Sequence, residues 1–134
     1  MATMITKTRP NRKTISIMGS VWTIEWRTRE EDVKLIDCDG YCDETIKTII
    51  VGWYEWDGRN KNNMAEYTSK VLRHELVHAM LYESGLAANS SKEWAINEEM
   101  VDWIAFQLPR MAEEILPIAK KVCKELEKNL VLEV

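Results

Sequence analysis

Over its first third, the chain alternates hydrophobic and polar positions with a period of two. The apolar members of this pattern are Ile15, Ile17, Trp22, Ile24 and Trp26. Such alternation predicts two half-buried β-strands. Met18, Gly19 and Ser20 lie between them, and the glycine is free to adopt a positive φ. We therefore expect a β-hairpin over residues 14–27.

Two further strands are predicted before the pattern changes. Residues 33–42 are suited to a short strand, and residues 45–56 form the clearest strand in the chain. One face of the latter carries Ile46, Thr48, Ile50, Tyr54 and Trp56, and the other carries Ile49, Val51 and Trp53. Because apolar groups lie on both faces, we expect this strand to be covered on both sides.

Helical spacing replaces this alternation after the turn-rich residues 57–60. Asn63 is a suitable N-cap because its side chain can accept a hydrogen bond from a free backbone N–H of the first turn. Gly85 is suited to the left-handed position that ends a helix. The sequence therefore predicts a helix over residues 64–84.

Two more helices are expected in the last third of the chain. Ser90-Ser91-Lys92-Glu93 has the form of a capping box, which predicts a second helix that Pro109 ends. A third helix follows over residues 110–128, with a kink or a break at Pro117. Its apolar positions are Ile115, Ile118, Ala119, Val122 and Leu126.

The order of these elements defines the expected fold class. Strands come first and helices follow, which is typical of an α+β domain. We expect an N-terminal, antiparallel-rich sheet followed by three helices, in a single domain over residues 14–134. Residues 1–13 are polar and basic, and we expect them to form a disordered leader.

Composition and charge narrow the possible functions. The 134 residues carry a net charge of −4 at pH 7, which does not support a nucleic-acid partner. The apolar runs fall short of the ~20 residues that a membrane span needs, and the N-terminus lacks the apolar region of a secretory signal. We therefore expect a cytoplasmic protein with no membrane partner.

The two histidines of the chain lie in one short motif, His74-Glu75-Leu76-Val77-His78, inside the first predicted helix. Four residues advance an α-helix by ~400°, so the two imidazoles project ~40° apart on the same face. Side chains placed in this way can bind one tetrahedral Zn²⁺. Glu75 lies at the edge of that face, where it can act as general base on a water at the metal.

A third ligand must be a carboxylate, because the chain has no third histidine. The second predicted helix offers Glu98 and Glu99. Its apolar stripe is centred on Trp94, Val101, Ile104, Ala105 and Leu108. Glu98 lies ~60° from the centre of this stripe and Glu99 ~160° away, so Glu98 is the predicted ligand. Asp102 lies one turn further on and can accept the outer N–H of a ligating imidazole, which we expect to be that of His74.

These two motifs resemble those of the gluzincin metallopeptidases of the thermolysin type. The chain is most similar to the minimal, single-domain gluzincins, which include the ImmA/IrrE-type peptidases of mobile elements and small phage-encoded zincins. The segment Glu98–Ala105 resembles their Glu-x-x-Ala-Asn-x-Phe-Ala pattern, and Gly40-Tyr41-Cys42-Asp43 resembles the glycine turn and strand before their metal helix. The resemblance covers residues 35–108.

The resemblance implies a site, a fold and a mode of substrate binding. It assigns His74, His78 and Glu98 to zinc, Glu75 to the role of base, and Asp102 to the support of a ligand. It also implies a zincin-like fold, in which a mixed sheet packs on the metal helix and an edge strand aligns an extended peptide across the zinc. Residues 46–54 are the predicted edge strand.

Peptide hydrolysis also needs a group that stabilises the oxyanion. With both histidines assigned to the metal, a tyrosine is the expected donor. Tyr82 lies one turn after His78 on the same helical face and is the predicted donor, with Tyr54 and Tyr67 as alternatives.

The sequence thus predicts a zinc-dependent metallopeptidase that acts on a protein or peptide. One alternative is a non-catalytic, zinc-stabilised module that binds a partner, and another is a zinc hydrolase of a non-peptide amide bond. Glu75 argues against the first, since a structural zinc site needs no base and usually has four protein ligands. The absence of a secretion signal argues against extracellular use in the second.

Cys38 and Cys42 form the remaining candidate for metal chemistry. They lie four residues apart across a predicted turn, but no matching pair of histidines or cysteines completes a second site. We expect reduced thiols, with a thiolate that reaches the zinc and holds a latent form as the alternative.

Overall fold

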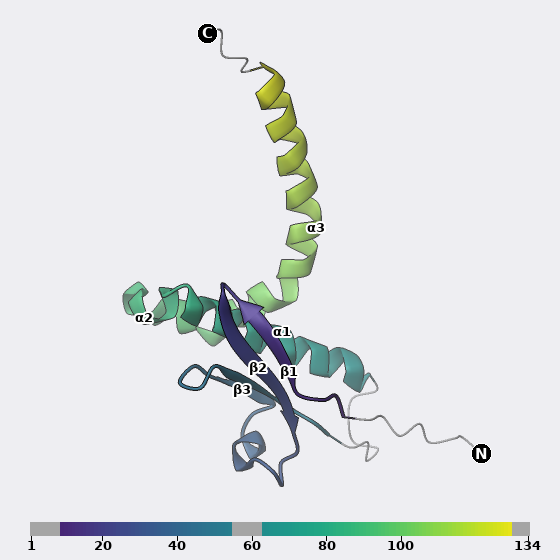
Figure 1. Ribbon diagram of the computed structural model, residues 1–134, viewed down its shortest axis with the longest axis vertical. Helices are drawn as coiled ribbons and strands as arrows, with labels where there is room; N and C mark the ends of the chain where they lie inside the picture. The colour runs from purple at the N-terminus through teal and green to yellow at the C-terminus, as the bar shows by residue number, and fades with distance from the viewer. Residues whose placement is uncertain (1–8, 55–62, 130–134) are drawn as a thin grey trace, which may run out of the picture.

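The computed structural model describes residues 9–54 and 63–129. Figure 1 shows a twisted sheet followed by helices, of which the last extends far from the rest of the domain. The α+β class predicted from the sequence is therefore confirmed. The strands are β1 (Lys13–Ile17), β2 (Ser20–Arg27), β3 (Gly40–Asp43) and β4 (Thr48–Gly52), and the α-helices are α1 (Met64–Glu83), α2 (Leu86–Asn89) and α3 (Glu98–Asn129).

The predicted hairpin is present as β1 and β2, which pair in antiparallel fashion with Ile17 opposite Ser20. The connecting turn consists of Met18, with φ 49°, and Gly19, with φ 87°. Two successive positive φ values are the geometry of a type I′ turn, whose twist matches that of the strands it joins. The glycine adopts this geometry without strain, as predicted.

The sheet is mixed, with the strand order β1-β2-β4-β3. β4 runs parallel to β2 and antiparallel to β3, and all five of its residues are buried. Coverage of this strand on both faces is thus confirmed. The prediction that residues 46–54 form the edge strand is wrong, because β4 is central and the edges are β1 and β3. Ile46, which precedes β4, is 64% exposed.

The region predicted as one strand over residues 33–42 contains two elements. Val33–Ile36 forms a 3₁₀ helix, η1, whose first turn is capped by the side chain of Asp32. The strand begins only at Gly40. A Cβ atom at Gly40 would lie 2.8 Å from Cγ1 of Val71, so the glycine permits a close approach of β3 to α1.

Helix α1 agrees with its prediction at both ends. The side chain of Asn63 accepts a hydrogen bond from the backbone N–H of Glu66, and Gly85 follows the helix with φ 81°. The helix packs on the sheet through Ala79. The buried core at this interface comprises Ile17, Trp22, Ile24, Ile49, Val51 and Ala79.

The predicted capping box at residues 90–93 is wrong. Lys92 and Glu93 have φ values of 54° and 57°, which break the helical path within the 3₁₀ segment η2 (Ser91–Ile96). Helix α3 begins at Glu98 instead, where the side chain of Asn97 accepts a hydrogen bond from the N–H of Met100. Trp94, predicted to lie on the stripe of this helix, precedes it and is exposed.

The predicted end at Pro109 is also wrong, because α3 continues through Pro109 and Pro117 to Asn129. Each proline lacks an N–H and so removes one backbone hydrogen bond, but its ring can still adopt helical φ. The second and third predicted helices are therefore one helix of 32 residues. Within the described residues, no helix is long and apolar enough to cross a membrane.

Part of the predicted basic leader, residues 9–13, contacts the domain. Lys13 already belongs to β1, and the guanidinium of Arg9 forms an ion pair with Glu31 and donates to the carbonyl of Trp26. These contacts attach residues 9–13 to the domain. Residues 1–8, the rest of the predicted leader, lie outside the described part of the chain.

Candidate metal centre

Helix α1 places its two histidines one turn apart, as the spacing predicted. The Nε2 atoms of His74 and His78 lie 3.2 Å apart. The two rings meet edge to face, with centroids separated by 4.8 Å. Both side chains are largely buried, so their positions are fixed by the surrounding helices. The two ring nitrogens thus converge on one point.

Glu98, in the first turn of α3, completes this cluster. Its Oε2 atom lies 2.9 Å from Nε2 of His74, and its Oε1 atom lies 3.1 Å from Nε2 of His78. The cap at Asn97 fixes where α3 begins and therefore where this carboxylate points. Among the described residues, His74, His78 and Glu98 form a group whose ligand atoms all lie within 4.8 Å of one another.

Asp102 lies one turn beyond Glu98 and contacts the other side of His74. Its Oδ1 atom is 2.8 Å from Nδ1 of that ring, so Nδ1–H donates to the carboxylate. In a neutral imidazole this leaves a lone pair on Nε2, which faces the oxygen of Glu98. Two acceptors at this distance repel each other unless a cation or a second proton lies between them.

Glu75 is the buried carboxylate of the cluster, with only 5% of the residue exposed. Its Oε1 atom lies 3.9 Å from Nε2 of His74. Its Oε2 atom is buried and has no hydrogen-bond partner in the structure. Burial raises the pKa of Glu75 to about 7; the electrostatic interaction with His74 lowers it and that with Glu98 raises it. A carboxylate of this kind is suited to exchange a proton near neutral pH.

Burial has the opposite effect on His78. It lowers the pKa of the imidazole, because the charged form is poorly solvated there. The neutral form, which offers a lone pair to a metal, is therefore favoured over a wider pH range.

The donor set fits a zinc ion. Two ligand atoms at ~2.0–2.1 Å from a tetrahedral zinc lie ~3.3 Å apart, close to the 3.2 Å between the two Nε2 atoms. The buried Oε2 atom of Glu75 has no hydrogen-bond partner, and buried polar atoms normally have one. A water at the metal would provide it. On the α3 side the cluster opens to solvent, since the side chains of Glu98 and Asp102 are 72% and 60% exposed. A fourth coordination position can be reached from there.

The three candidate tyrosines occupy different surroundings. Tyr54 donates its hydroxyl proton to Asp39 at 2.7 Å, and Tyr67 donates to the same carboxylate. Tyr82 lies on α1, one turn after His78, and burial raises its pKa together with the charges of Glu44, Cys42, Glu98 and Glu75. Of the three tyrosines, Tyr82 is thus the one whose pKa is raised by the carboxylates of Glu98 and Glu75.

Sequence reasoning missed one residue that shapes the site. Asn97 sets the start of α3, but the stronger-looking capping box at residues 90–93 obscured this signal. Cys42, which the sequence offered as an alternative metal ligand, lies on β3, close enough to Glu75 for the negative charge of the carboxylate to help raise its pKa to about 12, after burial as the main cause. Cys38 and Cys42 are both free thiols, as predicted.

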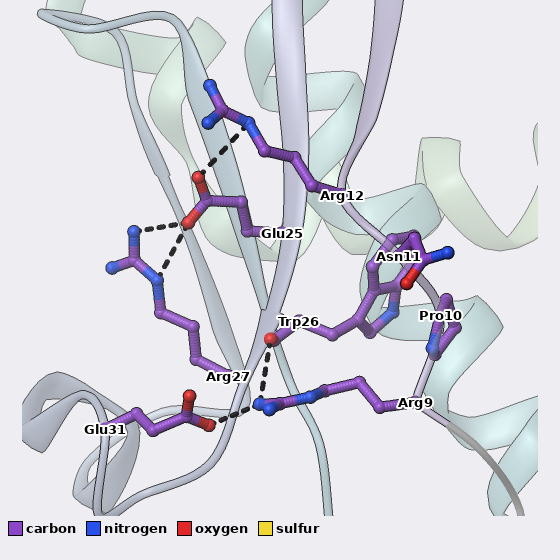
Figure 2. Close-up of a pocket in the computed structure, with 8 residues that line it drawn as sticks. All are labelled: Arg9, Pro10, Asn11, Arg12, Glu25, Trp26, Arg27 and Glu31. Carbon is purple, nitrogen blue, oxygen red and sulfur yellow. Dashed lines mark hydrogen bonds and ion pairs between the residues drawn. The ribbon is translucent and has the colours of Figure 1, made fainter.

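A second feature, a hollow of about 440 Å³, lies away from this cluster beside β2. Its lining residues are Arg9, Pro10, Asn11, Arg12, Glu25, Trp26, Arg27 and Glu31. Figure 2 shows that the arginine side chains point toward carboxylates: Arg9 pairs with Glu31, and both Arg12 and Arg27 pair with Glu25. Each charged side chain that lines the hollow thus already has a partner of opposite charge.

Comparisons of the chain with protein-family profiles, with curated proteins and with solved structures gave no match. The geometry of the cluster and the motifs that build it are therefore the basis for assigning a function.

The raised pKa of Glu75 predicts how the metal-free protein responds to pH. The folded state retains a proton up to about pH 7 that the unfolded chain loses near its ordinary pKa of 4.5. The free energy of unfolding therefore falls as the pH rises from 4.5 to 7, by about 3 kcal/mol, and stays level above that range.

Glu75→Gln removes this titration. In the presence of a chelator, urea denaturation should show the variant to be more stable than the wild type at pH 8, by up to about 3 kcal/mol, and nearly equal to it at pH 4. Glu66→Gln, at an exposed position of the same helix, is the matched control and should follow the wild type. A Glu75→Gln difference that does not change with pH would show that the carboxylate is not buried as described.

Proposed function

We propose that this protein is a zinc-dependent metallopeptidase of the gluzincin type, which hydrolyses peptide bonds in a protein or peptide. The observation that carries the proposal is the convergence of His74, His78 and Glu98 beside the buried, unpartnered oxygen of Glu75. Two imidazoles and one carboxylate, with an opening to solvent, are the ligand set of a catalytic zinc site. A structural site would use a fourth protein ligand there.

Each residue of the cluster has a role in this chemistry. Bound zinc would supply a Lewis acid that lowers the pKa of a water and polarises the substrate carbonyl. Glu75, whose Oε2 atom is buried and without a partner, would accept the proton of the water and return it to the leaving amine. Asp102 accepts the Nδ1–H of His74 and so holds the ring with Nε2 toward Glu98 and His78, the residues that would bind the metal with it. Tyr82 keeps its proton because its pKa is raised, and donates it in a hydrogen bond to the developing oxyanion.

The sheet supports a peptide as the substrate. β3 lies at the end of the strand order and packs on α1, the helix that carries the two histidines. Its outer edge can pair with an extended chain, which binds a peptide by main-chain hydrogen bonds and demands little of its sequence. A mixed sheet with an antiparallel edge strand beside the helix that carries the histidines supports the zincin-like fold that the resemblance implies.

A cleavage assay tests this proposal. The zinc-loaded protein is incubated with a peptide library derived from a digested proteome, and new termini are identified by mass spectrometry. We expect new termini with the zinc-loaded protein, none after treatment with a chelator, and their return when zinc is restored. Stoichiometric zinc binding without any new terminus would instead favour a non-catalytic zinc module.

A further inference from the structure

The second half of α3 extends away from the other described elements of the domain. Figure 1 shows this part of the helix, coloured green to yellow, projecting away from the sheet and from α1. Among the described residues, α3 packs against α1 and η2, and the buried part of that contact is Val101 and Ala105, near the start of the helix. The helix from residue 108 onward spans ~30 Å at 1.5 Å per residue.

This projecting part carries a continuous apolar stripe. Its members are Leu108, Met111, Ile115, Ile118 and Val122, between 36% and 64% exposed. The alternating spacing of three and four residues is that of the a and d positions of a coiled coil. Ile104 precedes the stripe in the same register and packs against the buried contact with α1. The surface that joins α3 to the domain therefore continues beyond the part that α1 covers.

The two prolines of α3 lie on a different face of the helix from the apolar stripe. At 100° per residue, Pro109 and Pro117 lie ~130–150° from the centre of the stripe. Each removes one backbone hydrogen bond from a helix that would already be marginal on its own in water. A partner along the apolar stripe would supply the stabilisation that the isolated segment lacks.

The charges and small residues beside the stripe identify the occupant. We propose that this surface binds a second copy of the same chain, with the two α3 helices antiparallel. In that alignment Ile115 of one copy lies opposite Ile118 of the other, and Met111 lies opposite Val122. Glu114 and Lys121 flank the stripe on one side. In this alignment Glu114 of each copy lies opposite Lys121 of the other copy.

The other flank of the stripe carries Ala112 and Ala119. These two alanines also lie opposite each other in the antiparallel pair, where their small side chains allow the helices to approach closely. In a parallel pair, Glu114 would face Ala119 and Lys121 would face Leu126, so neither charge would meet one of opposite sign. The charge pattern therefore favours the antiparallel arrangement.

Sedimentation of the full chain tests the proposal with a matched pair of variants. We expect a dimer for the wild type, and a monomer for Ile118→Asp, which places a charge in the centre of the interface. Leu116→Asp makes the same change at an exposed apolar position ~130° from the stripe and should remain a dimer. Thermal melts followed by circular dichroism check that both variants stay folded.

Several results would overturn the proposal. A monomeric wild type at the highest soluble concentration would show that the stripe is covered by another protein or by the chain itself. Equal behaviour of Ile118→Asp and Leu116→Asp, whether both dimeric or both monomeric, would show that the stripe is not the interface.

Charge exchange tests the orientation. Glu114→Lys and Lys121→Glu each create like-charge pairs, so each should weaken the dimer several-fold, while the double variant should return to the wild-type affinity. If the double variant is instead weaker than either single variant, the two residues do not face each other and the antiparallel arrangement is wrong.

Discussion

Glu75→Gln is expected to lower peptide hydrolysis by ~10²–10⁴-fold, the range that a positioned general base contributes. Zinc should stay bound, because the two imidazoles and Glu98 remain in place. The physical reason is that the amide cannot accept the proton that the buried carboxylate of Glu75 accepts in the wild type. The measurement is the rate of cleavage of a peptide found in the library assay, together with the zinc content of each sample.

Glu66→Gln is the matched control for this experiment. It makes the same chemical change at an exposed position of α1 and should leave the cleavage rate unchanged. Equal cleavage by Glu75→Gln and the wild type would rule out Glu75 as the base. Loss of zinc from Glu75→Gln would mean that the residue is a ligand instead.

Glu98→Ala is expected to lose zinc, whereas Glu99→Ala is expected to retain it. Both oxygens of Glu98 lie within 3.1 Å of an imidazole nitrogen, while Glu99 is an exposed neighbour on the same turn. Even the outer partners of metal ligands contribute ~10–100-fold to affinity, so removal of a ligand should weaken binding by more than ~100-fold. Competition with a chromogenic chelator gives the two affinities, and equal values would remove Glu98 from the ligand set.

The site was more predictable from the sequence than the fold around it. The spacing of His74 and His78 fixes their geometry on any helix, and Asn63 and Gly85 mark the ends of that helix clearly. The choice of Glu98 over Glu99 followed from the apolar stripe, of which Val101 and Ala105 are indeed buried. These are local relations, in which residues a few positions apart determine the outcome.

The wrong predictions concern relations between distant segments. β4 was expected at the edge, but pairing with β2 on one side and β3 on the other places it in the centre. The alternation of apolar residues shows that a strand is covered on both faces, and says nothing about its neighbours in the sheet. Strand order depends on crossovers, which local patterns do not encode.

The start of α3 was missed because two capping signals compete. Ser90 and Glu93 match a capping box, but Lys92 and Glu93 adopt positive φ values, and Asn97 caps the helix instead. The end was missed because a proline was expected to stop the helix. In the projecting part of α3, the exposed position of the prolines lets the helix continue at the loss of one backbone hydrogen bond each.

The two halves of α3 thus have separate roles in the proposals made here. The first two turns supply Glu98 and Asp102 to the cluster with His74, and the part after residue 108 supplies the proposed interface with a second copy. Ile118, in the apolar stripe, lies far along the helix from Glu98. If the Ile118→Asp variant is monomeric and still binds zinc, the two roles are independent.

X-ray absorption at the zinc edge of the loaded protein is the most direct test of the cluster. We predict one zinc per chain, bound by two imidazole nitrogens at ~2.0–2.1 Å and by light oxygen ligands, one from Glu98 and one from solvent. A sulfur neighbour at ~2.3 Å would instead show that Cys38 or Cys42 binds the metal. That result, or the absence of stoichiometric zinc, would contradict an open centre formed by His74, His78 and Glu98.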